Sequence, residues 1–407
     1  MSVPDASADA FARPDVGVDA APRLDAEAPS DAAGLPPRFE SIAAGPCVVD
    51  DATDPASEIR IGLRPCREGV CEELLLRDAA GLSLRVIRVE GRGEGQVPLL
   101  LTALDELAEL LYVVVLDVTS GSTPAVRAVA RIPSRHGEPC GFSAPGAGPE
   151  GAAFMMTEVE GGSGHLFHYR AGDRRFGPSV AEAQLLPGHR IELQSVGRDR
   201  VIATAGSRGV RVWTPEGGAD RPWAEREHEL EGPLRHVRFR PDGALDAWIS
   251  SRGLVRLSWP ALEVEATYFE SRETPSWAAA GDLIAWAARV SGDPERRYAF
   301  ASGRLCGETL CDLAPLEAPL PSRYRGHPRA RGGVVLLGDY SFSDAYLLRV
   351  RDGASRVLDT VPEGRFSPPV LTDRFAYTVH DADERTWDRN ERFLRFPYPD
   401  GFAPGSE

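Results

Sequence analysis

The chain has 407 residues, 42% of them apolar, and a formal charge of −15 at neutral pH. All 46 basic residues are arginine, so the sequence offers no lysine for a Schiff base, a P-loop or a kinase site. The acidic balance argues against general binding to a nucleic-acid backbone, which needs clustered positive charge. No apolar run reaches about 18 residues, so the sequence predicts no membrane-spanning helix.

The first 38 residues are mainly alanine, aspartate and proline, with few large apolar side chains. Such a segment cannot bury enough surface to offset the entropy lost on ordering, so residues 1–38 are predicted to be a disordered, acidic linker. The segment resembles the tether that follows the lipidated cysteine of exported bacterial lipoproteins, although no signal peptide is visible at Met1. This resemblance implies a lipid anchor on a processed N-terminus, in the bacterial envelope or at the cell surface.

From residue 39 to residue 402, short apolar runs alternate with turns rich in glycine, proline and aspartate. The stretch "HVRFRPDGALDAWISSRGLVRLSW" (236–259) illustrates the pattern. Val237 and Phe239 alternate with arginines at the period of a strand. "PDG" has the residues of a tight turn, and "ALDAWIS" and "LVRLSW" are interpreted as the next two strands. The stretch is therefore predicted to be part of a β-meander. Residues 403–407 are predicted to be a C-terminal tail.

The middle strand of this meander recurs along the chain, with starts between 37 and 50 residues apart. The copies are 72–78, 109–117, 152–159, 200–206, 244–250, 282–288, 332–338 and 374–380. Four-stranded meanders repeated every ~40–50 residues are typical of β-propeller blades. The sequence therefore predicts an all-β fold, a single propeller of seven or eight four-stranded blades over 39–402. Residues 40–50 are predicted to supply the missing fourth strand of the last blade and to close the ring.

Two segments resemble WD-repeat propellers: "RVIATAGSRGVRVWTPEGG" (200–218) and "DAWISSRGLVRLSW" (246–259). "PGHR" (187–190) and "RGHP" (325–328) resemble the Gly-His pair at the entry of a blade in that family. No aspartate follows Trp213 or Trp259, so the family's hydrogen-bonded His–Asp network is not carried over. The resemblance implies a divergent member of the fold and, as a tendency of the class, a binding platform.

The six cysteines fall into two Cys-x4-Cys pairs and two single residues: Cys66 and Cys71, Cys306 and Cys311, and Cys47 and Cys140. A disulfide across each short pair is the simplest interpretation, and it requires an oxidising compartment. Cys47 and Cys140 are expected to pair with each other, although six cysteines allow many connectivities. Two alternatives stay open: reduced thiols in a cytosolic protein, and a four-cysteine zinc site.

Three histidines, His189, His236 and His327, fall near the start of a blade's first strand, which lines the central channel of a propeller. They are candidate ligand-binding residues, although structural or solvent-exposed roles explain them as well. Trp277 and Trp387 fall in loop-like sequence and are candidate contact residues, since exposed aromatic side chains dominate many binding sites. No metal site is predicted from these residues.

No catalytic signature is found: "GGSGH" (161–165) lacks the last glycine of Gly-x-Ser-x-Gly, and the acidic stretch 380–391 lacks the glycine of a calcium loop. The sequence predicts an exported, tethered binding or scaffold protein without cofactor, whose propeller loops bind a protein or glycan partner. Two alternatives stay open: a propeller hydrolase or lyase acting on a polymer at the channel mouth, and a cytosolic WD-repeat-like scaffold.

Overall fold

The computed structural model describes residues 39–404 with gaps. The residues left out within this range are 45–46, 68–69, 92–98, 106, 119–122, 134–139, 149, 159–161, 185–190, 207, 216–222, 241, 271–275, 290–297, 317–327, 339–344, 353, 359–364, 367–368 and 382–390. The chain divides into two units, Met1–Pro37 and Arg38–Glu407. The predicted linker over 1–38 and residues 405–407 of the predicted tail lie outside the described residues.

Five sheets of the second unit are four-stranded antiparallel meanders, each formed by consecutive strands. Their strands are β9 (Cys140–Gly148), β10 (Gly151–Glu158), β11 (Ser163–Arg170) and β12 (Ala181–Gln184); β13 (Ile191–Val196), β14 (Val201–Ala205), β15 (Gly209–Pro215) and β16 (Trp223–Glu229); β17 (Leu234–Phe239), β18 (Leu245–Ile249), β19 (Gly253–Leu257) and β20 (Val264–Glu270); β21 (Ser276–Ala280), β22 (Leu283–Arg289), β23 (Tyr298–Cys306) and β24 (Thr309–Pro315); and β25 (Arg329–Arg331), β26 (Val334–Gly338), β27 (Ala345–Arg349) and β28 (Ala354–Leu358).

A sixth, twelve-stranded sheet combines strands from both ends of the described chain, in the order β1-β2-β8-β7-β6-β5-β4-β32-β31-β29, with β3 beside β4 and β30 beside β31. Its strands are β1 (Phe39–Ala44), β2 (Cys47–Ala52), β3 (Ile59–Pro65), β4 (Glu72–Asp78), β5 (Ser83–Glu90), β6 (Leu99–Asp105), β7 (Leu110–Asp117), β8 (Ala125–Pro133), β29 (Arg365–Phe366), β30 (Val370–Leu371), β31 (Phe375–Asp381) and β32 (Glu391–Pro397). Among the described residues, α1 (Pro55–Glu58) is the only helix.

The meander predicted over 236–259 is confirmed as parts of β17, β18 and β19. The turn after β17 contains Gly243 at φ +94°, a left-handed conformation that glycine adopts without strain. Val237, Phe239, Val255 and Leu257 pack in one apolar cluster, as the alternation of apolar and polar residues predicts.

The central strands are buried on both faces, because each sheet packs between two others. In β7, Val113 and Val115 belong to a cluster shared with β10 and β11, whereas Val114 and Leu116 belong to a cluster shared with β4 and β31. This double burial explains why β7 is a nearly continuous apolar run instead of an alternating one.

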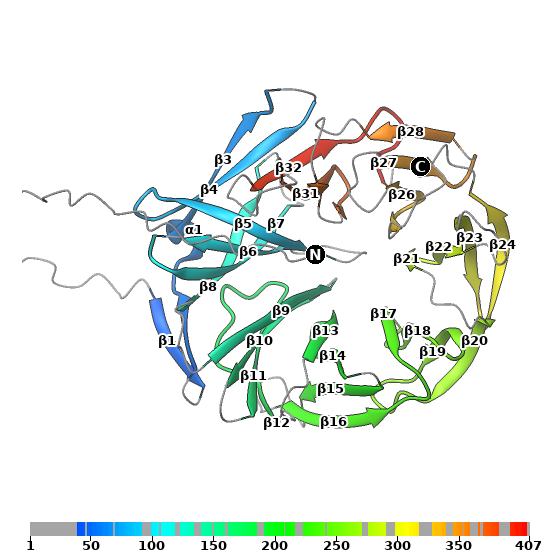
Figure 1. Cartoon of the computed structure of the whole chain (residues 1–407), viewed down its shortest axis with the longest axis horizontal. Coiled ribbons are helices and arrows are strands. Elements are labelled where there is room, and N and C mark those ends of the chain that lie inside the picture. The colour runs from blue at the N-terminus through cyan, green and yellow to red at the C-terminus, as the bar shows by residue number, and fades with distance from the viewer. Residues whose placement is uncertain are drawn as a thin grey trace, which may run out of the picture. The chain divides into compact units, whose positions relative to one another are not determined.

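The first strands of successive sheets contact one another: β9 contacts β13, β13 contacts β17, β17 contacts β21, and β21 contacts β25. Figure 1 shows the sheets of this unit following one another around a common centre, and each of the five four-stranded sheets runs outward from its first strand. The described part of the chain is therefore an all-β, propeller-like fold.

The prediction that residues 40–50 pair with the last strand is wrong. They form β1 and most of β2, and β2 pairs with β8. The strand beside β32 is β4, with Leu74 opposite Phe393 and Glu72 opposite Arg395. Arg395 is 3% exposed, and its Nε donates to Glu72 at 2.8 Å. The ion pair between the buried Arg395 and the half-exposed Glu72, together with the apolar side chain of Leu74, adapts β4 to the place beside β32.

Candidate functional site

Side chains alternate between the two faces of β2, and the two faces make different contacts. Cys47 and Val49 are buried in the cluster shared with the sheet β9–β12, and Asp51, two residues further on, is also buried. Between them, Asp50 lies on the opposite face, where its carboxylate pairs with Arg131 of β8. One face of β2 therefore attaches the strand to the neighbouring sheet, and the other forms part of the surface described below.

Two attachments hold β2 to the sheet β9–β12. A disulfide joins Cys47 to Cys140 at the start of β9, with 5.6 Å between their Cα atoms. The carboxylate of Asp51 accepts backbone N–H groups from Phe176 at 3.3 Å and Gly177 at 2.9 Å, in the connection between β11 and β12. On β1, Glu40 pairs with Arg175 of the same connection, so the β1–β2 hairpin is fixed at three points on a sheet with which it shares no strand pairing.

Burial raises the pKa of Asp51 from 3.8 to about 6, although the N–H groups of Gly177 and Phe176 favour the ionised form. Between these two pH values the folded protein holds a proton that the unfolded chain has released. The stability that Asp51 contributes is therefore present below about pH 4 and is lost as the pH rises through about 6.

Asp51→Asn should remove this pH dependence, because the amide does not titrate. Relative to the variant, the wild-type protein should lose on the order of 2–3 kcal/mol of unfolding free energy between about pH 4 and pH 7.5. Urea denaturation of both proteins at a series of pH values measures this difference. A difference that stays constant across the series would contradict the assignment.

Arg131 is the centre of the opposite face of this sheet. It lies in register with Asp50 on β2 and with Tyr112 on β7. Its guanidinium donates to Asp50 at 2.8 Å and lies 4.0 Å from the centroid of the Phe39 ring. Burial raises the pKa of Tyr112, and Arg131 opposes that shift. Two hairpins that are far apart in the sequence, β1–β2 and β7–β8, thus meet at one arginine.

The turn between β6 and β7 holds an apolar side chain out in solvent. The buried carboxylate of Asp105 accepts the backbone N–H groups of Leu107 at 3.0 Å and Ala108 at 3.1 Å. Glu109 has φ +52°, in the left-handed region. These contacts define the conformation of the turn, yet the Leu107 side chain is 84% exposed. An exposed leucine on a turn of defined conformation is a candidate contact residue.

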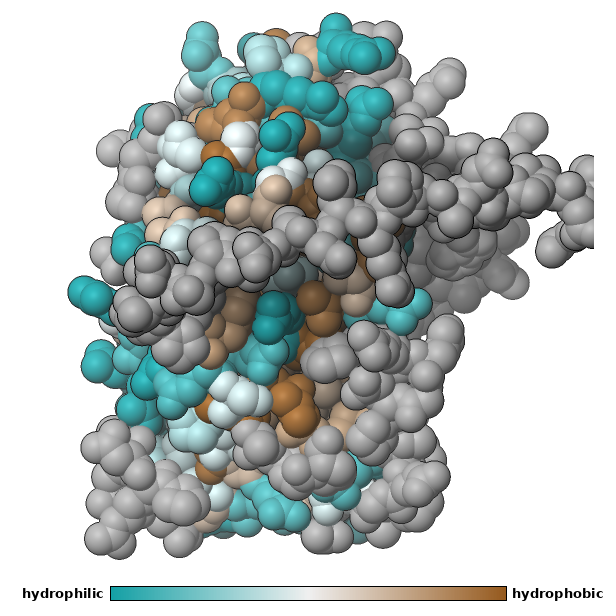
Figure 2. All heavy atoms as spheres, turned by 90° about the vertical axis from the view of Figure 1, so that its left-hand side faces the viewer, coloured by the Kyte–Doolittle hydropathy of each residue, from teal (hydrophilic) through white to brown (hydrophobic). Residues whose placement is uncertain are grey.

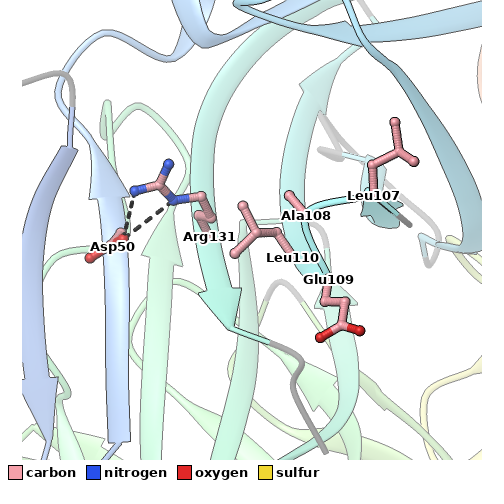
Figure 3. Close-up of a pocket in the computed structure, with 6 residues that line it drawn as sticks. All are labelled: Asp50, Leu107, Ala108, Glu109, Leu110 and Arg131. Carbon is pink, nitrogen blue, oxygen red and sulfur yellow. Dashed lines mark hydrogen bonds and ion pairs between the residues drawn. The ribbon is translucent and has the colours of Figure 1, made fainter. Parts of the chain in front are cut away.

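A hollow of about 700 Å³ lies between this turn and the arginine, and we call the set Asp50, Leu107, Leu110 and Arg131 that lines it the Leu107 surface. Figure 3 shows Arg131 directed at Asp50 on one side of the hollow and Leu107 on the other, with Leu110 between them. A second hollow of about 430 Å³ also includes Leu107 and extends to Leu82 and Leu104. Leu107 is therefore flanked by concave surface on two sides.

Around these hollows the surface is mixed in character. Figure 2 views the molecule from the side of β1 and α1, and shows apolar and polar residues interspersed there, without one continuous apolar face among the coloured residues. Arg131 is already paired with Asp50, so the Leu107 surface presents a neutral ion pair beside two leucines. This arrangement can bind an apolar side chain together with polar groups around it.

The six cysteines form three disulfides, in the pairs expected from the sequence: Cys66–Cys71, Cys306–Cys311 and Cys47–Cys140. Within the described ranges, no group of three or more His, Cys, Asp or Glu residues could hold a metal ion. The same residues contain no helix that is long and apolar enough to cross a membrane.

Of the five predicted ligand-binding residues, Trp277 is the one whose side chain lies within the described part of the chain. His189, His327 and Trp387 lie outside the described residues, and so does the side chain of His236, whose backbone belongs to β17. The placement of Trp277 in a loop is wrong. It lies in β21, is 4% exposed and packs with Trp248 and its neighbours in the core, because β21 begins one residue before it.

The sequence interpretation missed Leu107 and Arg131. The available signal was "LDELAELL" (104–111), where Asp105 breaks a long apolar run and is followed by a leucine among acids. An aspartate whose side chain accepts backbone N–H groups a few residues later is a common turn arrangement. Nothing in the sequence around Arg131 indicates its pairing with residue 50.

No family model and no curated protein sequence matches the chain. Several solved structures resemble it. Sqt1 of Saccharomyces cerevisiae is 13% identical, with a TM-score of 0.43, over 86% of this chain and 97% of that one. The WD40 domain of Toxoplasma gondii coronin is 9% identical, with a TM-score of 0.45, over 90% of each chain. Virginiamycin B lyase of Staphylococcus aureus is 10% identical, with a TM-score of 0.43, over 84% of this chain and all of that one.

Proposed function

We propose that this chain is a non-catalytic binding protein that engages a protein partner through the Leu107 surface. The observation that carries the proposal is the Leu107 side chain, 84% exposed on a turn that is held by the buried Asp105. A leucine that is accessible in the free protein gains about 1.5–3 kcal/mol when a partner buries it. The two hollows beside it offer places for side chains of that partner.

A protein partner fits this surface better than a glycan. A glycan is held mainly by hydrogen bonds, and two of the three charged groups that line this hollow, Asp50 and Arg131, already bond to each other; Glu109 is the third. Leu107 and Leu110 instead favour apolar contacts, with the ion pair at the margin of the interface, as in protein–protein sites.

The compartment that we propose is oxidising and extracytoplasmic. Three disulfides in the described residues support this, because such bonds form and persist where thiols are not kept reduced. The linker over 1–38 would then be the tether between a lipid anchor and the folded unit, at the bacterial envelope or cell surface.

We propose further that the fold is a ring of seven blades. Five are the four-stranded sheets, and the sixth is β5–β8. The seventh would combine β30, β31 and β32 with β4, whose pairing with β32 supports the assignment. In this arrangement β1 and β2 are an addition outside β8, and the Leu107 surface lies where that addition meets the blade.

Leu107→Asp tests the proposed function. Immobilised wild-type protein should retain a specific protein from an envelope extract of the native host, and the variant should retain at least about tenfold less of it, since a buried charge replaces an apolar contact. The matched control is Val264→Asp, which makes the same change at a side chain 37% exposed on β20. Equal retention of the same protein by all three forms would rule out the Leu107 surface.

A further inference from the structure

A second apolar surface lies on the outer strands of two other sheets. On β20, Phe269 is 36% exposed, and on β24, Leu313 is 63% exposed. These strands belong to neighbouring sheets and contact each other. In Figure 1, β20 and β24 lie on the opposite side of this unit from β1 and β6. The second surface is therefore separate from the Leu107 surface.

Trp286 of β22 lies between the exposed side chains of Phe269 and Leu313. The ring of Phe269 lies 5.7 Å from the ring of Trp286. Gly303 of β23 leaves room beside the same tryptophan: a Cβ there would come within 2.9 Å of Leu313 Cδ2 and 3.7 Å of Trp286. Leu310 packs against the same cluster. We call Phe269, Trp286, Leu310 and Leu313 the Phe269–Leu313 surface.

The margin of this surface is acidic. Glu270 at the end of β20, Glu308 in the β23–β24 turn and Asp312 on β24 are all exposed. Within the described part of the β23–β24 hairpin, the exposed basic residue is Arg304, which lies opposite Cys311. Three acids and one arginine leave an excess of two negative charges beside the apolar side chains, so the local potential attracts positive charge.

We propose that the Phe269–Leu313 surface binds a protein segment whose apolar side chains are flanked by lysine or arginine. The apolar residues would bury Phe269 and Leu313, and the basic residues would face Glu270, Glu308 and Asp312. A second copy of this chain fits poorly, because its acidic margin and formal charge of −15 would repel the same surface. Together with the Leu107 surface, this site would let one molecule hold two partners on opposite sides.

The test uses two fluorescent amphipathic peptides, one of leucine and lysine and one of leucine and glutamate with the same spacing. The lysine peptide should bind the wild-type protein, and Leu313→Glu should weaken it at least about tenfold, measured by fluorescence anisotropy. Leu313→Glu also adds a negative charge. If charge alone attracted the lysine peptide, this variant would therefore bind it more tightly than the wild type.

Val264→Glu is the matched control, since it adds the same charge on β20 at a residue that lies opposite Leu257, away from Trp286. This variant should bind the lysine peptide as tightly as the wild type or more tightly. Two results would overturn the proposal: both variants strengthen binding, or the glutamate peptide binds as tightly as the lysine peptide. Because Leu313 and Val264 are exposed, circular dichroism should show both variants folded like the wild type.

Discussion

Replacing Cys47 and Cys140 together by alanine should lower the free energy of unfolding by about 4–5 kcal/mol. The bond joins residues 93 apart in the sequence. In the chain-entropy model, a cross-link that closes a loop of this length removes about 4.7 kcal/mol of conformational freedom from the unfolded chain. Mass spectrometry of the unreduced, alkylated wild-type protein identifies the bond, and urea denaturation measures the loss.

The two short disulfides provide the comparison. Cys66–Cys71 and Cys306–Cys311 each join residues only 5 apart, and the same model gives about 2 kcal/mol for a loop of that size. Double alanine variants of these pairs should therefore unfold at clearly higher urea concentrations than the variant of Cys47 and Cys140. If all three double variants lose the same free energy, loop length does not govern the stabilisation.

The long disulfide also connects stability to the candidate site. It joins β2 to β9, and β2 supplies the Asp50 that pairs with Arg131. A protein without this bond retains the hydrogen bonds of Asp51 and the ion pair of Glu40 with Arg175 as attachments to the sheet β9–β12. The Leu107 surface thus depends on contacts on the face of β2 that points away from it.

Local sequence pattern predicted the strands well but not all of their partners. The stretch 236–259 has alternation and turn residues that act over a few positions, so its strands were found with their faces. β4, and not residues 40–50, pairs with β32. This pairing depends on contacts of Leu74 and Glu72 with residues more than 300 positions later in the sequence. Both segments have strand periodicity, and periodicity carries no information about so distant a partner.

The candidate site was missed for the same reason. Leu107 and Arg131 are ordinary residues in their own segments. Arg131 becomes part of a site through Asp50 and Phe39 of the β1–β2 hairpin, and Leu107 lines the same hollow as Asp50 and Arg131. Conversely, the sequence before Trp277 has the composition of a loop, but Trp277 itself lies in β21, and the burial of that strand places its side chain in the core. Sequence pattern thus locates elements better than it locates the surfaces made between them.

The buried aspartate of β18 should produce the other large effect. Asp246 is fully buried, and its carboxylate accepts from Arg238 of β17 at 2.6 Å and lies 3.6 Å from Arg240. Arg238 also donates to the carbonyl of Gly281 in the neighbouring sheet at 2.9 Å. The buried carboxylate therefore pairs with two arginines at a junction between sheets.

Asp246→Ala should cost about 3–5 kcal/mol of unfolding free energy, because it leaves the charges of Arg238 and Arg240 without their buried partner. The control is Asp242→Ala, whose side chain is 43% exposed and pairs with Arg240 and Arg256, and which should cost less than about 1 kcal/mol. Urea denaturation measures both variants. A loss of less than about 1 kcal/mol for Asp246→Ala would mean that solvent reaches the two arginines and that the pair is not a buried one. A loss near 4 kcal/mol would make this network a main determinant of stability, as the long disulfide is expected to be. The network stabilises the folded sheets, whereas the disulfide destabilises the unfolded chain.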